Sequence, residues 1–594
     1  MGTDKIKNLF GKREIRWAKI IILAIISAAA IAISSGMSLR TQYPSLIALL
    51  CLIVFWAEGK LELSGKQKKF GNVLGFIYAG FVVVGSYDVW TNYGFMIPGQ
   101  NIVNFMIVAV GTVSLSVSGV KVIVGMLDRW ENKSKETEEK YSKFFIPVCF
   151  VIIFLCWFPY FLTYYPGVLS TDSIVQLAQV MGVEPYSNHH PMIHTLFLKC
   201  IYDMAFTVCK NTNASVAACV IVQMLIMDGI YTYMLSVMKK ANIKKKYLYL
   251  CLGFIALCPV NAYFSITIWK DILFGGFALL FAITFWQITQ LDFAHCKKSE
   301  TAGLLLRFLI VGMLFCLWRS NGFYAYLFCI PFFMLSKSLK KIKLWLAIAM
   351  FITVGAVFVI KGPVMEHYEV TQPDFVEHIN IPIQHVARVV VEKGCENLPA
   401  EDILWLNQIA DVEQFEEHYY PHISDGMKAY IRSGNADYLD EHKKEFFGLW
   451  LRWGVKYPGS YIRAQIDMTR GFWFPNYEYW VTWEGIEPNA LGIYRDSLVP
   501  DAVGLFMTAV QNFFKNMPFF ELLWKIGFFV WAELFCIAYT VRRRKSILIY
   551  LPTIAIFLTL MIATPVAGEF RYGYAFVTCL PFFMGITFPQ LQNK

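Results

Sequence analysis

The chain has 594 residues, of which 57% are hydrophobic and only 16% are charged, and its formal net charge is +10. A soluble chain normally carries about 25% charged residues, so this composition excludes an ordinary soluble protein and predicts a polytopic membrane protein. The basic residues fall in short loops between apolar runs, where they indicate topology, so the net charge predicts no nucleic-acid partner.

Continuous apolar runs predict the membrane spans. A transmembrane helix needs about 20 apolar residues, with about 17–25 tolerated. By this rule fourteen helices are expected, which makes the fold class an all-α polytopic bundle. They lie near 17–35, 43–58, 71–92, 102–127, 144–162, 214–238, 246–264, 271–290, 302–318, 322–337, 342–361, 519–541, 547–566 and 571–588.

The loops between these runs differ in charge, and this difference predicts their orientation. Basic loops such as "KKANIKKK", "SKSLKKIK" and "RRRK" all fall on one side if both termini are cytoplasmic. Segment 191–208 is also apolar enough to span, but a span there would invert every later loop. We therefore expect it to lie along the outer interface, with His194, Lys199 and Asp203 interrupting its apolar character.

The chain is expected to divide into four parts. Residues 1–143 form a region of four spans, and residues 144–361 form a core with an external loop at 163–213. Residues 362–516 are polar, with helical apolar spacing and Pro and Gly turns, which predicts a small, mainly helical extracytoplasmic domain. Residues 517–594 form three final spans. The extracytoplasmic domain holds one of the 14 cysteines, so no disulfide is expected within it.

This topology places five polar stretches on the external face. The first contains Asp172 in "LSTDSIVQ", in the first turn of a helix that a preceding hydroxyl residue caps. A carboxylate there is either a favourable helix-terminal charge or a reactive group. The second is "YSNHHPMIH", in which His189 and His190 precede Pro191. These histidines either lie neutral at the interface or bind a phosphate or a metal.

The third and fourth stretches lie at the ends of apolar runs. Lys270 and Asp271 in "ITIWKD" stand at a span start, where two charges are costly unless they are solvated or paired. Arg319 and Asn321 in "LWRSNG" lie between two apolar helices. The planar guanidinium suits bidentate phosphate recognition, although an ordinary hairpin also uses Asn-Gly.

The fifth stretch is "GEFRYGYAF", at the outer start of the last expected span. Glu569, Arg571 and Tyr572 there form either a local ion pair or a binding site for an anionic headgroup. Each stretch alone is a weak signal. Their convergence on one face is stronger, because that face follows from loop charge and not from the stretches themselves.

Together these stretches resemble the GT-C superfamily of integral-membrane glycosyltransferases, which use polyprenyl-phosphate-linked sugars and include protein O-mannosyltransferases and lipid A aminoarabinose transferases. The matching residues are Asp172, the "HHP" at 189–191, and Lys270 with Asp271. The resemblance implies that the first-loop acid acts as general base or metal contact and that the second-loop acid helps to place metal or phosphate. A group of bacterial multi-pass proteins with "YPG", "HHP", "WKD" and "RY" in this order is also similar.

The resemblance covers roughly 144–361, and the chain departs from the family in two ways. The usual paired Asp-Glu is a single acid followed by Ser173, and four spans precede this loop where the family generally has one. A divalent metal on Asp172 and Asp271 is therefore an open expectation. The metal-free reading assigns Asp172 as the base for an acceptor hydroxyl. Lys270, Arg319 and Arg571 then hold the leaving phosphate, with His189 and His190 as auxiliaries.

The leading hypothesis is transfer of a sugar from a polyprenyl-phosphate donor, drawn from the membrane lipids, to an envelope glycan, glycolipid or protein. The site would face the outside of the plasma membrane. A flippase or polysaccharide exporter is the first alternative, and it predicts ionisable residues inside spans, for which Asp228 and Glu533 are the candidates. A non-enzymatic envelope assembly or sensor protein, with 362–516 binding a ligand, is the second.

Overall fold

The computed structural model describes residues 12–94, 99–133, 141–291, 296–517 and 519–591. Within these residues the regular secondary structure is helical, and extended residues pair only in isolated β-bridges. Eight helices are long and apolar enough to cross a membrane, or nine if one bent pair counts as a span. These findings confirm an all-α, multi-pass membrane protein. The chain forms two compact units, which are described separately.

The smaller unit comprises residues Met1–Thr137, Trp473–Asn476 and Phe588–Lys594. Its helices α2 and α4 both pack on α6, and α3 packs on α2. Glycine permits the closest approach, since a Cβ on Gly75 would lie 2.5 Å from the Cα of Val117. Small residues at such crossings are typical of helix packing in membranes. The helices are α2 (Lys12–Ser34), α3 (Tyr43–Glu58), α4 (Gly65–Gly85), α5 (Tyr87–Thr91) and α6 (Gln100–Lys133).

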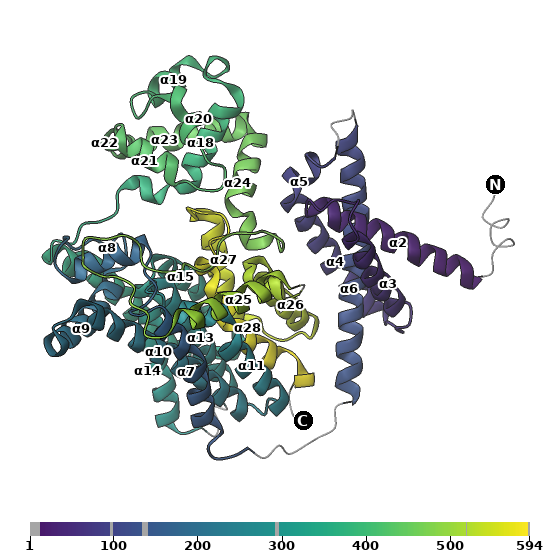
Figure 1. Ribbon diagram of the computed structural model, residues 1–594, viewed down its shortest axis with the longest axis horizontal. Helices are drawn as coiled ribbons and strands as arrows, with labels where there is room; N and C mark the ends of the chain where they lie inside the picture. The colour runs from purple at the N-terminus through teal and green to yellow at the C-terminus, as the bar shows by residue number, and fades with distance from the viewer. Residues whose placement is uncertain (1–11, 95–98, 134–140, 292–295, 518, 592–594) are drawn as a thin grey trace. The chain divides into compact units, whose positions relative to one another are not determined.

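The larger unit comprises residues Glu138–Phe472 and Tyr477–Thr587. Its helix α13 lies among α10, α14 and α28, and the last helices of the chain pack between earlier ones (Figure 1). Its apolar helices are α7 (Phe145–Thr163), α9 (Met192–Cys209), α10 (Thr212–Lys240), α11 (Lys245–Leu257), α12 (Pro259–Ser265), α13 (Lys270–Gln290), α14 (Lys298–Trp318), α15 (Ser320–Leu335), α16 (Lys343–Val359), α26 (Ile526–Arg542), α27 (Leu551–Ala563) and α28 (Tyr574–Thr587).

The fourteen expected spans agree with the structure in part. The expected span 71–92 is interrupted after Gly85, where α4 ends and α5 begins. The expected span 246–264 is the bent pair of α11 and α12, which meet at 56°. Helices α3, α15 and the one over Leu548–Ala563 are apolar but shorter than 18 residues. The number fourteen therefore stays a prediction.

Helix α9 is the segment that the loop charges place along the interface. Its 18 residues satisfy the length and composition of a span. It packs on α10 and on α8 (Thr171–Val180), and Lys199 Nζ donates to the carbonyl of Val180 at 3.1 Å. Because these contacts are compatible with either orientation, its interfacial placement stays a prediction.

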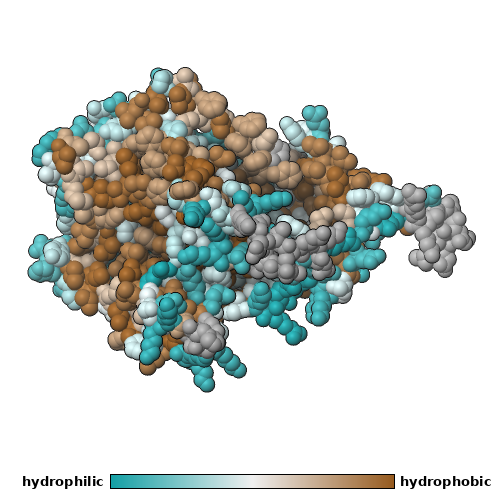
Figure 2. Space-filling model, turned by 90° about the horizontal axis from the view of Figure 1, so that it is seen from below, coloured by the Kyte–Doolittle hydropathy of each residue, from teal (hydrophilic) through white to brown (hydrophobic). Residues whose placement is uncertain are grey.

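Large apolar side chains cover much of the surface. Phe76, Leu250 and Phe351 are 65%, 67% and 80% exposed, and Figure 2 shows broad apolar areas with hydrophilic side chains gathered in separate groups. Apolar surface on this scale is unfavourable in water, and it suits contact with lipid tails.

The polar segment 362–516, called the helical insertion below, contains a compact helical part with its own apolar core. Residues from Val376 to Trp453 form that core, which includes the fully buried Ala387, Met427 and Leu439. The helices are α17 (Met365–His367), α18 (Asn380–Lys393), α19 (Ala400–Leu406), α20 (Phe415–His418), α21 (Asp425–Ser433), α22 (Ala436–Glu441), α23 (Lys443–Lys456), α24 (Pro458–Trp473) and α25 (Asp501–Asn516). Figure 1 shows α18, α19, α20, α21, α22 and α23 grouped together, whereas α25 lies apart from them near α26.

Candidate active site

Two extended segments bring the start of α8 beside the start of α13. The amide of Val168 donates to the carbonyl of Ile266 at 3.0 Å, and the amide of Ile268 donates back to Val168 at 3.2 Å. Ser173 Oγ then donates to the carbonyl of Ile268 at 2.8 Å. These bonds hold Asp172, in the first turn of α8, close to the first residues of α13.

Arg571 joins Asp172 to Glu569. Its Nη1 lies 2.7 Å from Asp172 Oδ2, and its Nε lies 3.2 Å from Glu569 Oε1. The guanidinium also lies over the Trp269 ring, 4.7 Å from its centroid. The indole Nε1 of Trp269 donates to Ser170 Oγ at 2.6 Å, which fixes the ring against the N-cap of α8. Arg571 is therefore held by two carboxylates and an aromatic surface.

Lys270 and the two histidines form a second contact in the same region. Lys270 Nζ lies 2.8 Å from His190 Nδ1, and the rings of His189 and His190 are 4.9 Å apart. An ammonium group can only donate, so Nδ1 accepts and His190 is neutral in this arrangement. The charge of Lys270 also acts on Asp172.

Asp271 and Arg319 form a third, deeper pair. Arg319 Nη1 lies 2.7 Å from Asp271 Oδ1, and the Asp271 side chain is fully buried. Neither carboxylate oxygen of Asp271 has a hydrogen-bond partner among the described residues, so the contact with Arg319 is an ion pair. Arg319 also lies 4.5 Å from the Tyr572 ring centroid, and its Nη1 donates to the Tyr572 carbonyl at 3.4 Å. This pair ties the start of α13 to the segment that carries Arg571.

Asn321 is the one predicted site residue that the structure does not join to the others. It lies in the first turn of α15, and within the described residues no hydrogen bond or ion pair links it to this group. The Asn-Gly sequence has a packing role instead, since a Cβ on Gly322 would lie 2.0 Å from the carbonyl oxygen of Phe315.

The helical insertion is anchored beside the site at two places. Asn188 donates through its amide to the carbonyl of Thr371 at 2.8 Å, directly before the two histidines. Ser424 donates through its amide to the carbonyl of Pro565 at 2.9 Å, and Ala567 donates to the carbonyl of His422 at 2.9 Å, shortly before Glu569. The insertion therefore braces two of the segments that supply site residues.

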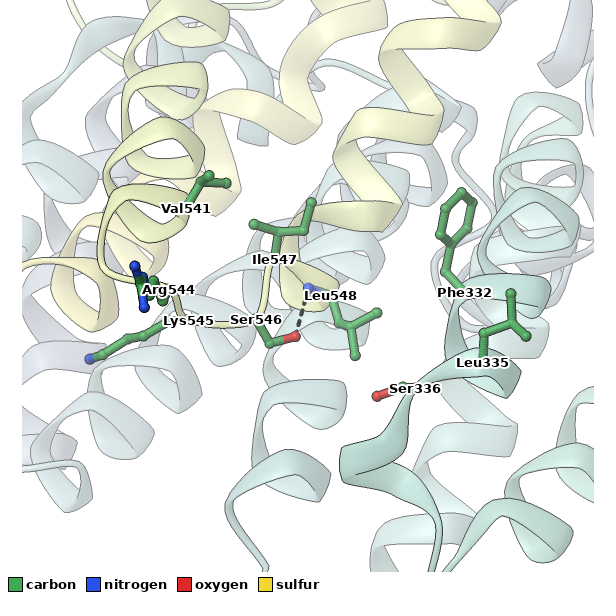
Figure 3. Close-up of a pocket in the computed structure, with 9 residues that line it drawn as sticks. All are labelled: Phe332, Leu335, Ser336, Val541, Arg544, Lys545, Ser546, Ile547 and Leu548. Atoms are coloured by element: carbon green, nitrogen blue, oxygen red, sulfur yellow. Dashed lines mark hydrogen bonds between the residues drawn. The ribbon is translucent and has the colours of Figure 1, made fainter. Parts of the chain in front are cut away.

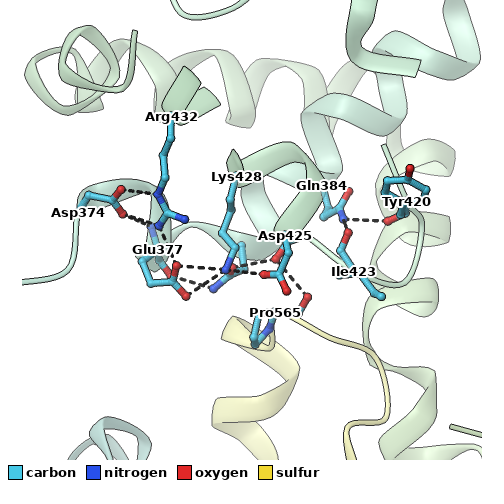
Figure 4. Close-up of polar contacts among 11 residues, drawn as sticks. Asp374, Glu377, Gln384, Tyr420, Ile423, Asp425, Lys428, Arg432 and Pro565 are labelled. Atoms are coloured by element: carbon cyan, nitrogen blue, oxygen red, sulfur yellow. Dashed lines mark hydrogen bonds and ion pairs between the residues drawn. The ribbon is translucent and has the colours of Figure 1, made fainter. Parts of the chain in front are cut away.

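A network of charges stabilises the second anchor (Figure 4). Lys428 Nζ lies 2.8 Å from Asp425 and 3.0 Å from Glu377, while Arg432 binds Asp374 at 2.6 Å. Gln384 Nε2 donates to the carbonyl of Ile423 at 2.6 Å. These contacts fix the loop that pairs with the segment around Pro565.

Comparison with known protein families places the chain in one of them. A model described as a family of unknown function, DUF6020, matches residues 184–594. The chain belongs to this family. No curated protein and no solved structure matches it.

The DUF6020 match covers all of the predicted site residues except one. His189, Lys270, Arg319 and Arg571 lie within it, whereas Asp172 lies just before it. Most of the smaller unit also lies outside the match. The description of the family names no activity.

The pKa values of Asp172 and Glu569, the two carboxyl groups that contact Arg571, are shifted in opposite directions. Burial alone raises the pKa of Asp172, but the charges of Arg571 and Lys270 outweigh it and hold this pKa well below its usual range. Burial raises the pKa of Glu569 to about 7, although Arg571 opposes the rise. Asp172 is therefore a carboxylate at neutral pH, whereas Glu569 titrates near neutrality.

The neutral state of His190 predicts a pH dependence of stability. Burial, together with the charge of Lys270, lowers its pKa to about 2. Between this value and the ordinary value near 6.5, the unfolded chain binds a proton that the folded chain does not, so stability rises with pH until about 6.5. From pH 7 to pH 5 the His190 contribution to the free energy of unfolding should fall by about 2 kcal/mol.

Thermal unfolding of the detergent-solubilised protein at pH 5 and pH 7 measures this effect. The His190→Gln variant should lose less stability at pH 5 than the original chain does. The His367→Gln variant changes an exposed histidine and should keep the original pH dependence. An unchanged pH dependence in His190→Gln contradicts the neutral, buried imidazole.

Trp269 and the segment around Gly485 are parts of the site that the sequence did not reveal. Tryptophan is common at membrane interfaces, so Trp269 carried no distinct signal. Leu169 pairs with this segment, since its amide donates to the carbonyl of Gly485 at 3.0 Å and its carbonyl accepts from Glu487 at 2.9 Å. A contact between residues more than 300 positions apart leaves no mark in local sequence.

The side chains do not fit the expected metal. Among the described residues, no three His, Cys, Asp or Glu side chains are grouped so that they could hold an ion. Asp172 and Asp271 each face an arginine instead.

A cavity in the larger unit lies away from these residues. It has a volume of about 540 Å³ and lies between the end of α15 and the loop after α26. Figure 3 shows the hydroxyl groups of Ser336 and Ser546 at this space, whereas the Lys545 ammonium group points away from Phe332 and Leu335. This open depression holds no candidate catalytic group.

Proposed function

We propose that the chain is a glycosyltransferase of the GT-C type, which moves a sugar from a polyprenyl-phosphate donor to an envelope glycan, glycolipid or protein. The site would lie on the extracytoplasmic side of the plasma membrane, as the loop charges predict. The observation that carries the proposal is the ion pair of Asp172 with Arg571, next to Lys270 and His190. One carboxylate and two cations from separate segments suit a base beside a phosphate.

The chemistry needs Arg571 to change partners. In the resting site its charge lowers the basicity of Asp172. An arriving donor phosphate would draw the guanidinium away, because bidentate contact with phosphate is strong. Asp172 would then lose its neutralising partner, and its pKa would rise towards the range that suits a base. Donor binding would thus activate the base.

The transfer step follows from this arrangement. Asp172 takes the proton of the acceptor hydroxyl, and the hydroxyl oxygen forms a bond to the anomeric carbon of the sugar. The bond from that carbon to the phosphate oxygen breaks, and its electron pair leaves with the polyprenyl phosphate. Lys270 and Arg571 offset the negative charge on this leaving group. Glu569 holds Arg571 from its other side.

A transfer assay tests the proposal. Purified protein in liposomes is supplied with labelled polyprenyl-phosphate sugars and with envelope acceptors, and labelled product is measured. The original chain should transfer label. Asp172→Asn should be slower by about 100-fold, because positioned proton transfer contributes at least that much.

Asp203→Asn is the matched control for this assay. It removes an exposed carboxylate on α9 that pairs with Lys199 at 3.1 Å, and transfer should be unchanged. Full transfer by Asp172→Asn would remove its assignment as the base. If the original chain transfers no sugar from any donor of this class, the glycosyltransferase itself is excluded.

Transport is the second candidate function, and two buried acids favour it. Asp228 and Glu533 are 0% and 2% exposed within apolar helices, and ionisable residues at such positions often mark transport pathways. Asp228 accepts a hydrogen bond from Thr232 at 3.2 Å, and Glu533 accepts one from Thr553. Each acid therefore has a hydrogen bond that gives it a structural role in the bundle. Because that role needs no transport pathway, transport ranks second. A non-enzymatic assembly or sensor role remains the third hypothesis.

A further inference from the structure

The smaller unit contains a cavity with a strongly basic lining. It has a volume of about 530 Å³ and lies where the end of α3 meets the beginnings of α2 and α4 and the middle of α6. Four basic side chains line it, against one acid. The basic residues are Arg16, Lys19, Lys68 and Lys121, and the acid is Glu58.

The single acid is already neutralised. Glu58 lies 3.1 Å from Lys121 Nζ and accepts a hydrogen bond from Ser118 Oγ at 2.6 Å. Arg16 donates to the carbonyl of Gly59, which carries no charge. In the part of the chain that the structure describes, Lys19 and Lys68 have no ion-pair partner. Among the described residues, the positive charges of Arg16, Lys19 and Lys68 therefore have no counter-charge at this cavity.

Lys19 is an exposed charge near the start of an apolar helix. Lys19 lies inside the apolar helix Glu14–Ser34, which is long enough to span a membrane. Charges in such segments are unfavourable unless they reach water or meet an opposite charge. The apolar side chains of Leu23, Val113 and Val117 line the same cavity. It therefore combines sites for an anion with a surface for hydrocarbon.

We propose that this cavity binds the headgroup of an anionic phospholipid. The phosphate would lie among Arg16, Lys19 and Lys68, and an acyl chain would follow the apolar wall. A membrane lipid fits better than a free phosphate, because a free phosphate makes no use of that wall. Basic pockets between membrane helices on the cytoplasmic side bind lipids of this kind, and loop charge predicts that side here. The site is independent of the proposed enzymatic activity.

Lipid binding to the purified, delipidated full chain tests the proposal. Native mass spectrometry is used to titrate it with phosphatidylglycerol, with phosphatidylcholine, and with phosphatidylglycerol in the presence of inorganic phosphate. The lipid with the anionic headgroup should bind at least tenfold more tightly than the zwitterionic one. Lys19→Gln with Lys68→Gln should lower that affinity by about tenfold or more.

Lys66→Gln with Lys69→Gln is the matched control. It removes the same charge from two exposed lysines that do not line the cavity, and binding should stay within twofold. Equal binding of both lipids, or an equal loss in the control, overturns the proposal. Competition by millimolar inorganic phosphate would assign the site to free phosphate instead. If the double variant fails to fold, the exposed Lys68→Gln alone should still weaken binding severalfold, and an unchanged affinity overturns the proposal.

Discussion

Replacement of Arg319 by methionine should destabilise the protein by about 3–5 kcal/mol. The change leaves the fully buried Asp271 side chain without the guanidinium that lies 2.7 Å away. Removing one partner of a buried ion pair is costly because the remaining charge is neither paired nor solvated. Thermal unfolding of the detergent-solubilised variant measures the effect.

A second substitution separates this cause from a general packing defect. Asp271→Asn combined with Arg319→Met removes both charges, so it should recover most of the lost stability. Lys443→Met provides a surface control, because Lys443 is 45% exposed and pairs with the exposed Asp440 at 2.8 Å. Its loss should stay below about 1 kcal/mol. If the double variant is as unstable as Arg319→Met alone, the unpaired charge is not the cause.

The Asp271–Arg319 pair shows how far the sequence alone could reach. The sequence predicted that two charges at a span start need solvent or partners, and the structure provides a partner for each. His190 faces Lys270, and Arg319 faces Asp271. Which residues pair could not be predicted, because the partners belong to helices whose packing depends on the whole bundle.

The convergence of the five stretches was predictable for a physical reason. Loop charge reports which side of the membrane each helix end occupies, so distant stretches could be assigned to one side without knowing the fold. Loop charge predicts no distances between the stretches, and Asn321 lies apart from the group that holds Arg571. The prediction for Asn321 relied on an Asn-Gly turn, and the close contact at Gly322 explains that turn by packing.

The span count was less predictable than the spatial grouping of the polar stretches. Hydropathy detects apolar runs, but it does not detect where a helix breaks. The break after Gly85 and the 56° bend between α11 and α12 both fall inside runs that are continuous in composition. The bend between α11 and α12 falls at Pro259, and an average over a window of residues does not register a single proline.

Replacement of Arg571 by glutamine should cause the largest loss of transfer activity, by about 1,000-fold. One guanidinium contacts Asp172 at 2.7 Å and Glu569 at 3.2 Å and lies over Trp269. Glutamine supplies neither the charge for a leaving phosphate nor the planar fork. Arg571→Lys keeps the charge without the fork, so its activity should fall between the two. The transfer assay with purified protein in liposomes measures all three chains.

Two comparisons make the Arg571 result specific to the site. Arg495→Gln removes an arginine that also lies over an aromatic ring, 4.5 Å from the Tyr164 centroid, and it should leave transfer within a few-fold of the original. If Arg571 and Asp172 act as a unit, the Arg571→Gln, Asp172→Asn double variant should lose much less than the product of the two single losses. If the loss in the double variant equals the product of the two single losses, Arg571 does not exchange Asp172 for the donor phosphate. Full activity in Arg571→Gln would show that the leaving phosphate is held elsewhere.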